Sequence, residues 1–338
     1  MLKADYRPYK FIFNFPGGTS RGVLTDKLSY FIRVWNDNTP DIVGLGEVSL
    51  IPNLSPETPA QVELLLNRFV KNPHTFYDNE DLSRYPAVKF GIETAILDLK
   101  SGGKQILYKS DFTNGKSGIR INGLVWMGDK ELMLKRIRDK VESGFTCIKL
   151  KIGAINFNDE LDLLKFIRKK YSHNDLEIRV DANGAFNFED ALLKLNTLTK
   201  YDIHSIEQPI KQGQWSKMAT LCKQTPLPIA LDEELIGVSD IGKRKSMLDT
   251  VNPQYIILKP SLIGGLNDTK IWSKLADERN IGWWVTSALE GNIGLNAIAQ
   301  WTYINGSDMP QGLGTGQVFS NNTPSPLIIK GEKLWHKI

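Results

Sequence analysis

The chain has 338 residues, of which 41% are hydrophobic and 24% charged, enough for one large domain or two ordinary ones with a sizeable core. The net charge of only +4 argues against a nucleic-acid-binding protein. Two cysteines, Cys147 and Cys222, argue against a disulfide scaffold, and no apolar run approaches the roughly 20 residues that span a membrane. Charged residues interrupt the N-terminal segment, where a signal peptide requires an apolar stretch, so a soluble cytoplasmic protein is expected.

The first 100 residues predict strands followed by helices. Aromatic and β-branched residues favour strands, and apolar residues at helical spacing favour helices. This order is typical of a small α+β domain. Strands are expected at 8–15, 28–36 and 42–48, and helices at 57–71 and 86–100.

Residues 103–118 lose this periodicity and are interpreted as a linker. Beyond it, short strands and helices alternate, which requires parallel strands. An open doubly wound sheet is one alternative. A closed barrel of the TIM type fits better, because the number of units approaches eight and residues 121–124 and 309–314 can supply the missing strands. Strands are expected at 145–152, 176–181, 203–208, 228–232, 254–259 and 282–287, and helices at 132–144, 158–171, 188–199, 214–224, 239–248 and 268–279.

Charged residues recur at one position of successive strand–helix units. Lys151, Asp181, Glu207, Asp232 and Lys259 are separated by 30, 26, 25 and 27 residues, and each interval equals about one unit. Each residue lies at the C-terminal end of its predicted strand. Active sites of βα barrels lie at that end, so these side chains are predicted to converge there.

Strand alternation adds a second lysine to this cluster. Lys149 and Lys151 point to the same side of their strand, and the apolar residues between them point to the helices. Buried charges of this kind must pair with each other or bind something. Three carboxylates favour a hard divalent cation, and Mg²⁺ fits best; salt bridges at the barrel mouth are the alternative.

The order and spacing of these residues resemble the enolase superfamily, and within it the muconate-lactonizing-like branch. This resemblance covers nearly the whole chain. It implies a modified βα barrel at 118–317 and an α+β capping domain at 1–105, with the segment 318–338 returning to the capping domain. The matching motifs are Lys149-Leu150-Lys151, Asp181-Ala182-Asn183, Ile206-Glu207-Gln208-Pro209, Ala230-Leu231-Asp232-Glu233 and Leu258-Lys259-Pro260.

Further segments resemble the o-succinylbenzoate synthase family of that branch. Dipeptide epimerases of the branch carry an Asp-x-Asp pair near the last barrel strand, whereas this chain has glycines and no acid at 312–316. One departure is Glu234, where many relatives have Ser. The supporting segments are Thr19-Ser20-Arg21-Gly22-Val23-Leu24, Ser287-Ala288-Leu289-Glu290, Asn292-Ile293-Gly294 and Gly312-Leu313-Gly314-Thr315-Gly316.

The resemblance implies a metal site and an assignment of the lysines. Asp181, Glu207 and Asp232 would bind Mg²⁺, with Mn²⁺ as a substitute, and the metal would stabilise an enediolate. Lys151 would remove the proton next to a carboxylate and return it to the departing hydroxide. Lys149 would assist Lys151, and Lys259 would stabilise the enediolate or, in an epimerase, act as a second acid and base.

Four further residues are predicted to contact the substrate, and three of them have a simpler alternative. Asn183 would support the metal ligands or a substrate oxygen, or only form a turn. Ser287 would bind the succinyl carboxylate, or only cap a helix. Arg21 lies in a glycine-rich segment that would form a lid, or only a surface hairpin. Gly312 would line the substrate site near the last barrel strand.

The resemblance implies a carbon–oxygen lyase of menaquinone biosynthesis. Its substrate would be 2-succinyl-6-hydroxy-2,4-cyclohexadiene-1-carboxylate and its product o-succinylbenzoate. An N-acylamino acid racemase or dipeptide epimerase of the same branch is the alternative, and a non-catalytic barrel is a third. The expected partner is a small-molecule carboxylate, with neither nucleic acid nor membrane insertion.

Overall fold

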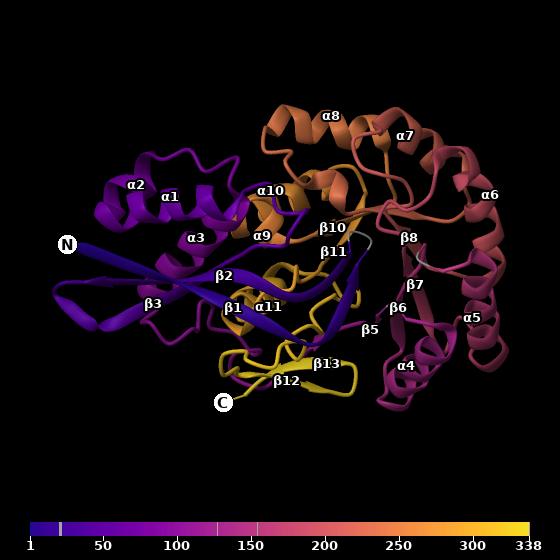
Figure 1. Ribbon diagram of the computed structural model, residues 1–338, viewed down its shortest axis with the longest axis horizontal. Helices are drawn as coiled ribbons and strands as arrows, with labels where there is room; N and C mark the ends of the chain where they lie inside the picture. The colour runs from indigo at the N-terminus through magenta and orange to yellow at the C-terminus, as the bar shows by residue number, and fades with distance from the viewer. Residues whose placement is uncertain (20–21, 127, 154, 338) are drawn as a thin grey trace.

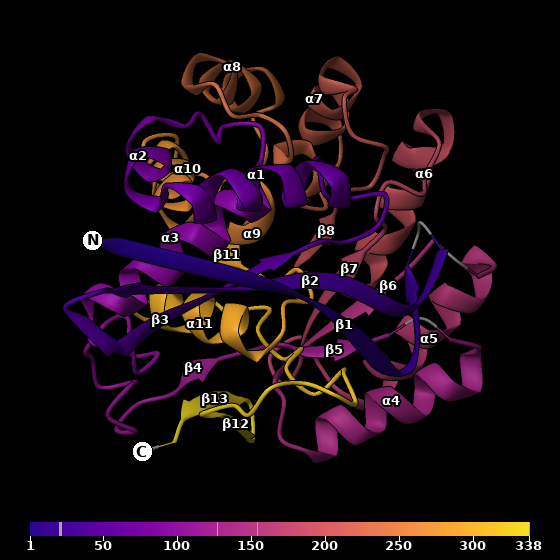
Figure 2. The same ribbon diagram turned by 60° about the vertical axis from the view of Figure 1, so that its left-hand side comes forward.

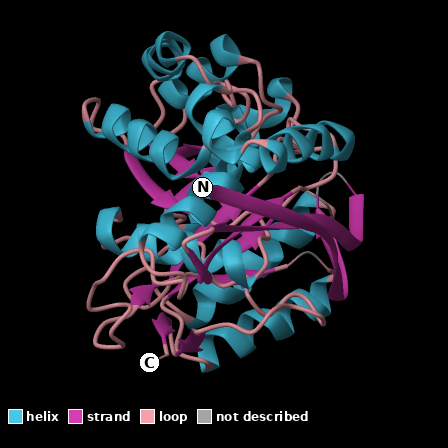
Figure 3. Ribbon diagram, turned by 90° about the vertical axis from the view of Figure 1, so that its left-hand side faces the viewer, coloured by secondary structure: helices cyan, strands magenta, loops and turns pink. Residues whose placement is uncertain are grey.

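The computed structural model describes residues 1–19, 22–126, 128–153 and 155–337. Two groups of elements lie side by side in Figure 1: N-terminal strands and helices, and a larger curled sheet surrounded by helices. In Figure 3 the strands occupy the middle of the molecule, with helices above and below them. Among the described residues, none of the helices has the length and apolar character that crossing a membrane requires.

The N-terminal group is an antiparallel sheet covered by helices, the α+β arrangement expected from the sequence. The helix that follows the sheet begins with a capping box, in which Thr58 and Gln61 satisfy each other's backbone amides. The first strand is longer than predicted, and the helix after Asn72 was not predicted. The elements are β1 (Leu2–Thr19), β2 (Gly22–Asn36), β3 (Thr39–Ser49), α1 (Pro59–Lys71), α2 (Pro73–Asn79) and α3 (Pro86–Lys100).

Two glycines of β3 allow α3 to pack directly on the sheet. A Cβ atom at Gly44 would lie 2.1 Å from the Ala95 carbonyl oxygen, and one at Gly46 would lie 2.0 Å from the Gly91 carbonyl oxygen. The Gly44-Leu45-Gly46 segment therefore serves close helix–sheet packing.

The second group is a parallel sheet with a helix between most successive strands, as the alternating pattern predicts. Figure 1 shows α5 to α8 forming an arc outside β6 to β8. Isolated bridges join Thr286 to Gly312 and Gln311 to Ile121, so residues 311–312 close the sheet into a barrel. The strands are β5 (Gly123–Val125), β6 (Cys147–Lys151), β7 (Glu177–Asp181), β8 (Ser205–Glu207), β9 (Ile229–Leu231), β10 (Tyr255–Leu258) and β11 (Gly282–Val285).

The barrel helices bury one face against the strands. Ile148, Leu150 and Ile152 point outward into this apolar layer, which leaves Lys149 and Lys151 facing inward as predicted. The helices are α4 (Lys130–Glu142), α5 (Phe157–Lys170), α6 (Phe188–Leu198), α7 (Trp215–Gln224), α8 (Ile241–Val251), α9 (Pro260–Ile263), α10 (Gly265–Asp277) and α11 (Asn292–Asn305), with short 3₁₀ turns η1 (Thr199–Tyr201) and η2 (Glu233–Leu235).

The C-terminal segment contacts both groups. Val318 and Ser320 form backbone hydrogen bonds with Asn14 and Ile12 of β1, each at 2.9 Å. Farther on, β12 (Leu327–Lys330) and β13 (Lys333–His336) form a hairpin that pairs with β4 (Ile119–Arg120). Figure 2 shows this hairpin beside β4 and below β1. The exact domain boundaries at 105, 118 and 317 stay a prediction.

Candidate active site

Strand register brings the predicted site residues to one height in the barrel. Lys151 pairs with Asp181, and Asp181 pairs with Glu207, across the adjacent strands β6, β7 and β8. Asp232 directly follows β9, and Lys259 directly follows β10. All five therefore lie at the C-terminal ends of their strands, where side chains from successive strands converge.

Lys149 joins two of the carboxylates. Its Nζ lies 2.9 Å from Asp181 Oδ2 and also contacts Glu207 Oε2. All three side chains are almost fully buried, with Asp181 at 0% and Glu207 at 2% exposure. Burial alone would lower the pKa of Lys149, but Asp181 and Glu207 outweigh it, so its pKa is raised. Lys149 is therefore a buried cation held between two strand ends.

Lys151 reaches the same carboxylate from a more exposed position. Its Nζ donates hydrogen bonds to Asp181 Oδ2 at 2.7 Å and to Asn183 Oδ1 at 2.6 Å. Burial would raise the pKa of Asp181, yet Lys149 and Lys151 outweigh that effect and lower it. Asp181 is therefore held as a carboxylate by two ammonium groups.

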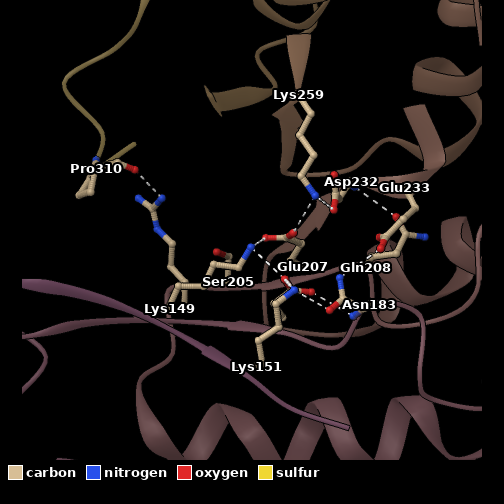
Figure 4. Close-up of polar contacts among 12 residues, drawn as sticks. Lys149, Lys151, Asn183, Ser205, Glu207, Gln208, Asp232, Glu233, Lys259 and Pro310 are labelled. Carbon is tan, nitrogen blue, oxygen red and sulfur yellow. Dashed lines mark hydrogen bonds and ion pairs between the residues drawn. The ribbon is translucent and has the colours of Figure 1, made fainter. Parts of the chain in front are cut away.

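Lys259 approaches from the opposite side of the barrel. Figure 4 shows Lys151 and Lys259 pointing toward the carboxylates from opposite sides. The Lys259 ammonium group contacts Asp232 and lies 4.0 Å from Glu207 Oε1. Burial raises the pKa of Asp232 against the opposing charge of Lys259, and burial and Asp181 raise the pKa of Glu207 to about 8.

Asn183 forms the turn that the sequence allowed and also contacts the charged cluster; its role toward a metal or substrate stays a prediction. Its backbone adopts a left-handed conformation with φ of 44°, so it forms the turn after β7. Its side chain also joins the cluster, accepting from Lys151 and donating to Glu233 Oε1 at 3.1 Å. Glu233 belongs to the motif Ala230-Leu231-Asp232-Glu233, but the sequence did not predict it as a site residue.

Glu234, the departure from the resembled pattern, supports the strand ends through Gln208. Its carboxylate accepts hydrogen bonds from the Gly213 amide at 2.7 Å and from Gln208 Nε2 at 3.0 Å. The side-chain oxygen Oε1 of Gln208 in turn accepts from the Asp232 amide at 3.2 Å. Glu234 therefore orients the backbone of Asp232 through one intermediate side chain.

The donor chemistry of the cluster fits a hard divalent cation. Asp181, Glu207 and Asp232 supply buried carboxylate oxygens, and Glu207 Oε1 has no hydrogen-bond partner among the described residues. Within the described part of the chain, no three His, Cys, Asp or Glu side chains stand in a ready metal-binding arrangement. Lys149 and Lys259 balance the carboxylate charge instead.

A cavity of about 110 Å³ opens beside this cluster. Lys149, Lys151 and Lys259 line its floor, and Ile51, Leu54 and Trp126 form an apolar part of its wall. Ile51 and Leu54 follow the capping-domain strand β3, and the sequence analysis did not identify them as site residues. The sequence signal that could have identified them is a pair of apolar residues in a proline-containing turn directly after a strand.

Three of the four predicted substrate-binding residues lie at this cavity. Asn183, Ser287 and Gly312 line the cavity, whereas Arg21 lies outside the described residues. Ser287 is not the cap of the next helix, because Gly291 occupies the N-cap of α11. The Ser287 amide donates to the Gly312 carbonyl oxygen at 3.0 Å, so that amide is already used.

Gly312 is required by the way the barrel closes. A Cβ atom there would lie 2.2 Å from Thr286 Oγ1. Larger residues are therefore excluded where the bridge to Thr286 closes the barrel. This segment contributes backbone, and no acidic side chain, to the cavity wall.

Residues 132–314 match the family model described as "Enolase C-terminal domain-like". The chain therefore belongs to the enolase superfamily, which the resemblance predicted. It is also 47% identical to the o-succinylbenzoate synthase of Desulfotalea psychrophila, over 98% of this chain and 98% of that protein. This places it in the o-succinylbenzoate synthase family, and it is an enzyme of the carbon–oxygen lyase class.

Solved structures agree with this assignment. The crystal structure of MenC from Desulfotalea psychrophila matches with a TM-score of 0.87 and 44% identity, covering 99% of each chain. A dipeptide epimerase from Enterococcus faecalis, complexed with Mg and the dipeptide L-Leu-L-Tyr, matches with a TM-score of 0.83 but 20% identity, covering 100% of this chain and 97% of that one. The second likeness shows the shared fold alone.

Proposed function

We propose that this enzyme dehydrates 2-succinyl-6-hydroxy-2,4-cyclohexadiene-1-carboxylate to o-succinylbenzoate. The observation that carries the proposal is the similarity to the Desulfotalea psychrophila synthase along nearly the whole chain, capping domain and barrel included. The opposed lysines and the adjoining cavity supply groups that this chemistry needs. The absence of an acidic side chain at 312–316 favours a substrate without an ammonium group at that position.

The proposal includes a divalent metal, Mg²⁺ or Mn²⁺ as its substitute, held by Asp181, Glu207 and Asp232. The three buried carboxylates and the unpartnered Glu207 Oε1 support this assignment. When bound, the metal would act as a Lewis acid for the negative charge that develops on the substrate carboxylate. Lysines that now neutralise these carboxylates would then face the substrate instead.

In the proposed reaction, Lys151 Nζ accepts the proton from ring carbon C1, next to the carboxylate. The C1–H electron pair delocalises into the carboxylate, and on its return the C6–O bond breaks. The leaving hydroxide takes the same proton back from the Lys151 ammonium group and departs as water. The ring loses one H and one OH and becomes aromatic, so the atoms balance without an oxidant or reductant.

The other lysines are assigned roles through charge. Lys149, buried between Asp181 and Glu207, would keep a positive charge beside Lys151 and the substrate carboxylate. Lys259 would stabilise the developing charge from the opposite side of the ring. Neither needs to move a proton in this reaction, because Lys151 serves both steps.

We assign the succinyl side chain to the cavity wall formed by Ser287 and Gly312, with Asn183 near the ring end. Ser287 would contact the succinyl group as part of this wall, since its hydroxyl proton is already donated to Glu290. Arg21 is retained as a proposed contact from the capping domain.

The test is the loss of cyclohexadiene absorbance with Mg²⁺ and again with EDTA. We expect rapid loss with Mg²⁺ that EDTA abolishes. Absence of loss in protein that binds Mg²⁺ would contradict the proposed substrate. Solvent deuterium incorporation at an amino-acid α-carbon, without elimination, would then identify an epimerase.

A further inference from the structure

A lysine of the capping domain is buried where its strand meets the barrel. Lys27 of β2 is only 2% exposed. Its Nζ donates to Ser49 Oγ on the adjacent strand β3 and, at 2.6 Å, to the Leu289 carbonyl oxygen of the barrel. The stacked rings of Phe11 and Phe319 lie close by, each with its centroid 5.8 Å from Nζ. A buried lysine is costly, so its contacts with Leu289 require an explanation.

Leu289 adopts a backbone conformation that its side chain disfavours. Its φ is +58°, in the left-handed region that non-glycine residues seldom occupy. Such residues persist only where the surroundings hold them, and they are frequent at ligand-binding sites. Leu289 also lines the proposed substrate cavity, between the barrel and the capping domain. The strained residue is therefore part of the substrate wall.

Two hydrogen bonds hold the Leu289 peptide groups. Its amide donates to Ser287 Oγ at 3.1 Å, within the same loop, while its carbonyl oxygen accepts from Lys27. The first bond joins two residues of the same loop, so it does not fix the position of the loop relative to the capping domain. The bond from Lys27 fixes the loop relative to the capping domain.

Buried carboxylates on both sides of Leu289 complete the arrangement. Glu290 accepts from the Ser287 hydroxyl at 2.7 Å and the Ala288 amide at 2.8 Å. Glu47, from the capping domain, accepts from the Gly291 amide at 2.7 Å. Both carboxylates oppose the lowering of the Lys27 pKa that burial causes. The buried Lys27 ammonium group therefore lies near Glu47 and Glu290, the two carboxylates that accept hydrogen bonds from the loop 287–291.

We propose that Lys27 is a positioning residue of the substrate pocket, which holds Leu289 in its left-handed conformation and so fixes the wall formed by Ser287, Ala288 and Leu289. This inference deepens the proposed function and rests on it for its kinetic test. Lys27 touches the wall and not the reacting atoms. It therefore acts on substrate binding in the ground state and transition state alike.

The kinetic test compares Lys27→Met with Lys10→Met, a matched control on β1 whose exposed side chain pairs with Asp26 at 3.1 Å. We expect Lys27→Met to raise KM about tenfold and to leave kcat within about twofold, because uniform binding is lost. Lys10→Met should leave both constants unchanged. Equal KM values in the wild type and Lys27→Met would overturn the proposal.

A glycine variant separates the backbone effect from general destabilisation. Glycine adopts positive φ without steric cost, so Leu289→Gly removes the need for a restraint. Adding Lys27→Met to Leu289→Gly should then raise KM less than about twofold. A full tenfold effect in that background, or failure of Lys27→Met to fold in both backgrounds, would show instead that Lys27 serves only the stability of the capping domain.

Hydrogen–deuterium exchange gives a readout that does not depend on any substrate. Exchange of the peptide that contains residues 286–294 should be faster in Lys27→Met and unchanged in Lys10→Met. Unchanged exchange in Lys27→Met would refute the proposal even in an inactive protein. An inactive wild type with the expected exchange pattern would contradict the proposed function alone.

Discussion

Asp181 and Glu207 lie opposite each other on neighbouring parallel strands and share one ammonium group, that of Lys149. Two buried carboxylates on paired residues of neighbouring strands would repel each other strongly if no cation stood between them. The arrangement therefore keeps negative charge concentrated at the strand ends while the lysine balances it. If the proposed metal binds, it and the lysine would be alternative partners of the same oxygens.

Replacing Lys149 by Met should destabilise the protein when no metal is present. The substitution removes one partner of a buried ion pair and leaves two carboxylates uncompensated, which typically costs about 3–5 kcal/mol. Mg²⁺ should restore part of this loss, since its binding to the folded state stabilises that state. Urea unfolding followed by tryptophan fluorescence, with EDTA and with Mg²⁺, measures both effects.

Lys194→Met is the control for that experiment. Lys194 pairs with Asp190 at 3.3 Å on the surface of α6, and such pairs contribute less than about 1 kcal/mol. A Lys149→Met variant that loses no more stability than this control would contradict the role assigned to Lys149. A loss that Mg²⁺ does not reduce would argue against a metal at these carboxylates.

Replacing Lys151 by Ala should remove most of the activity and leave the fold intact. A side chain that moves a proton in the transition state contributes about 10²–10⁴-fold to the rate, so kcat should fall by at least about 100-fold. Lys151 is less buried than Lys149, and its loss should alter stability less. Single-turnover kinetics measure the rate, and circular dichroism checks the fold. An unchanged kcat would refute the assignment of Lys151 as the base.

The site was predictable where chemistry and strand periodicity coincide. The interval from Lys151 to Asp181 is one strand–helix unit, and the structure indeed pairs these residues in register. The same reasoning holds for Glu207, which pairs with Asp181. Parallel strands of a closed barrel convert a repeated interval in sequence into a shared height in space. No comparable regularity marks the cavity wall.

Contacts between distant, irregular segments could not be read from the sequence. Lys27 and Leu289 are separated by 262 residues, and no periodicity connects them. The left-handed conformation of Leu289 was equally unpredictable, because leucine has no preference for positive φ. For Ser287, the sequence left carboxylate binding and helix capping open; the structure rules out the cap, because the helix begins later, at Asn292. Tertiary contacts decide such positions, whereas the strand pattern decides the barrel.

Glu234→Ser should weaken metal binding without touching a proposed ligand. Serine is too short to accept the hydrogen bonds from Gly213 and Gln208, so Gln208 Nε2 loses one of its two acceptors, and the Gln208 side chain that accepts from the Asp232 amide is held less firmly. Residues that orient metal ligands typically contribute about 10–100-fold to metal affinity. Isothermal titration with Mg²⁺ should show a fall of about tenfold. Glu234→Gln, which retains the reach, should show a smaller effect; equal affinities in all three proteins would contradict this role.

The pH dependence of stability should reveal a buried carboxyl group between the two groups of elements. Glu93 of α3 accepts hydrogen bonds from the Leu266 and Asn267 amides at 2.7 and 3.0 Å, at the start of α10. Burial raises its pKa from 4.5 to about 7, although those amides and Lys89 oppose the shift. Between these two values the folded protein holds a proton that the unfolded chain has released. The contribution of Glu93 to stability is therefore fully present below pH 4.5 and is lost as the pH rises through 7.

Glu93→Gln isolates this contribution, because glutamine does not titrate. The wild type should lose up to about 3 kcal/mol relative to Glu93→Gln between pH 5 and pH 8, as the buried group gives up its proton. Urea unfolding at intervals across that range measures the difference. Glu131→Gln, on the exposed face of α4, should follow the wild-type pH dependence. Parallel curves for the wild type and Glu93→Gln would mean that the α10 amides and Lys89 hold this group as a carboxylate throughout, and that burial does not control its charge.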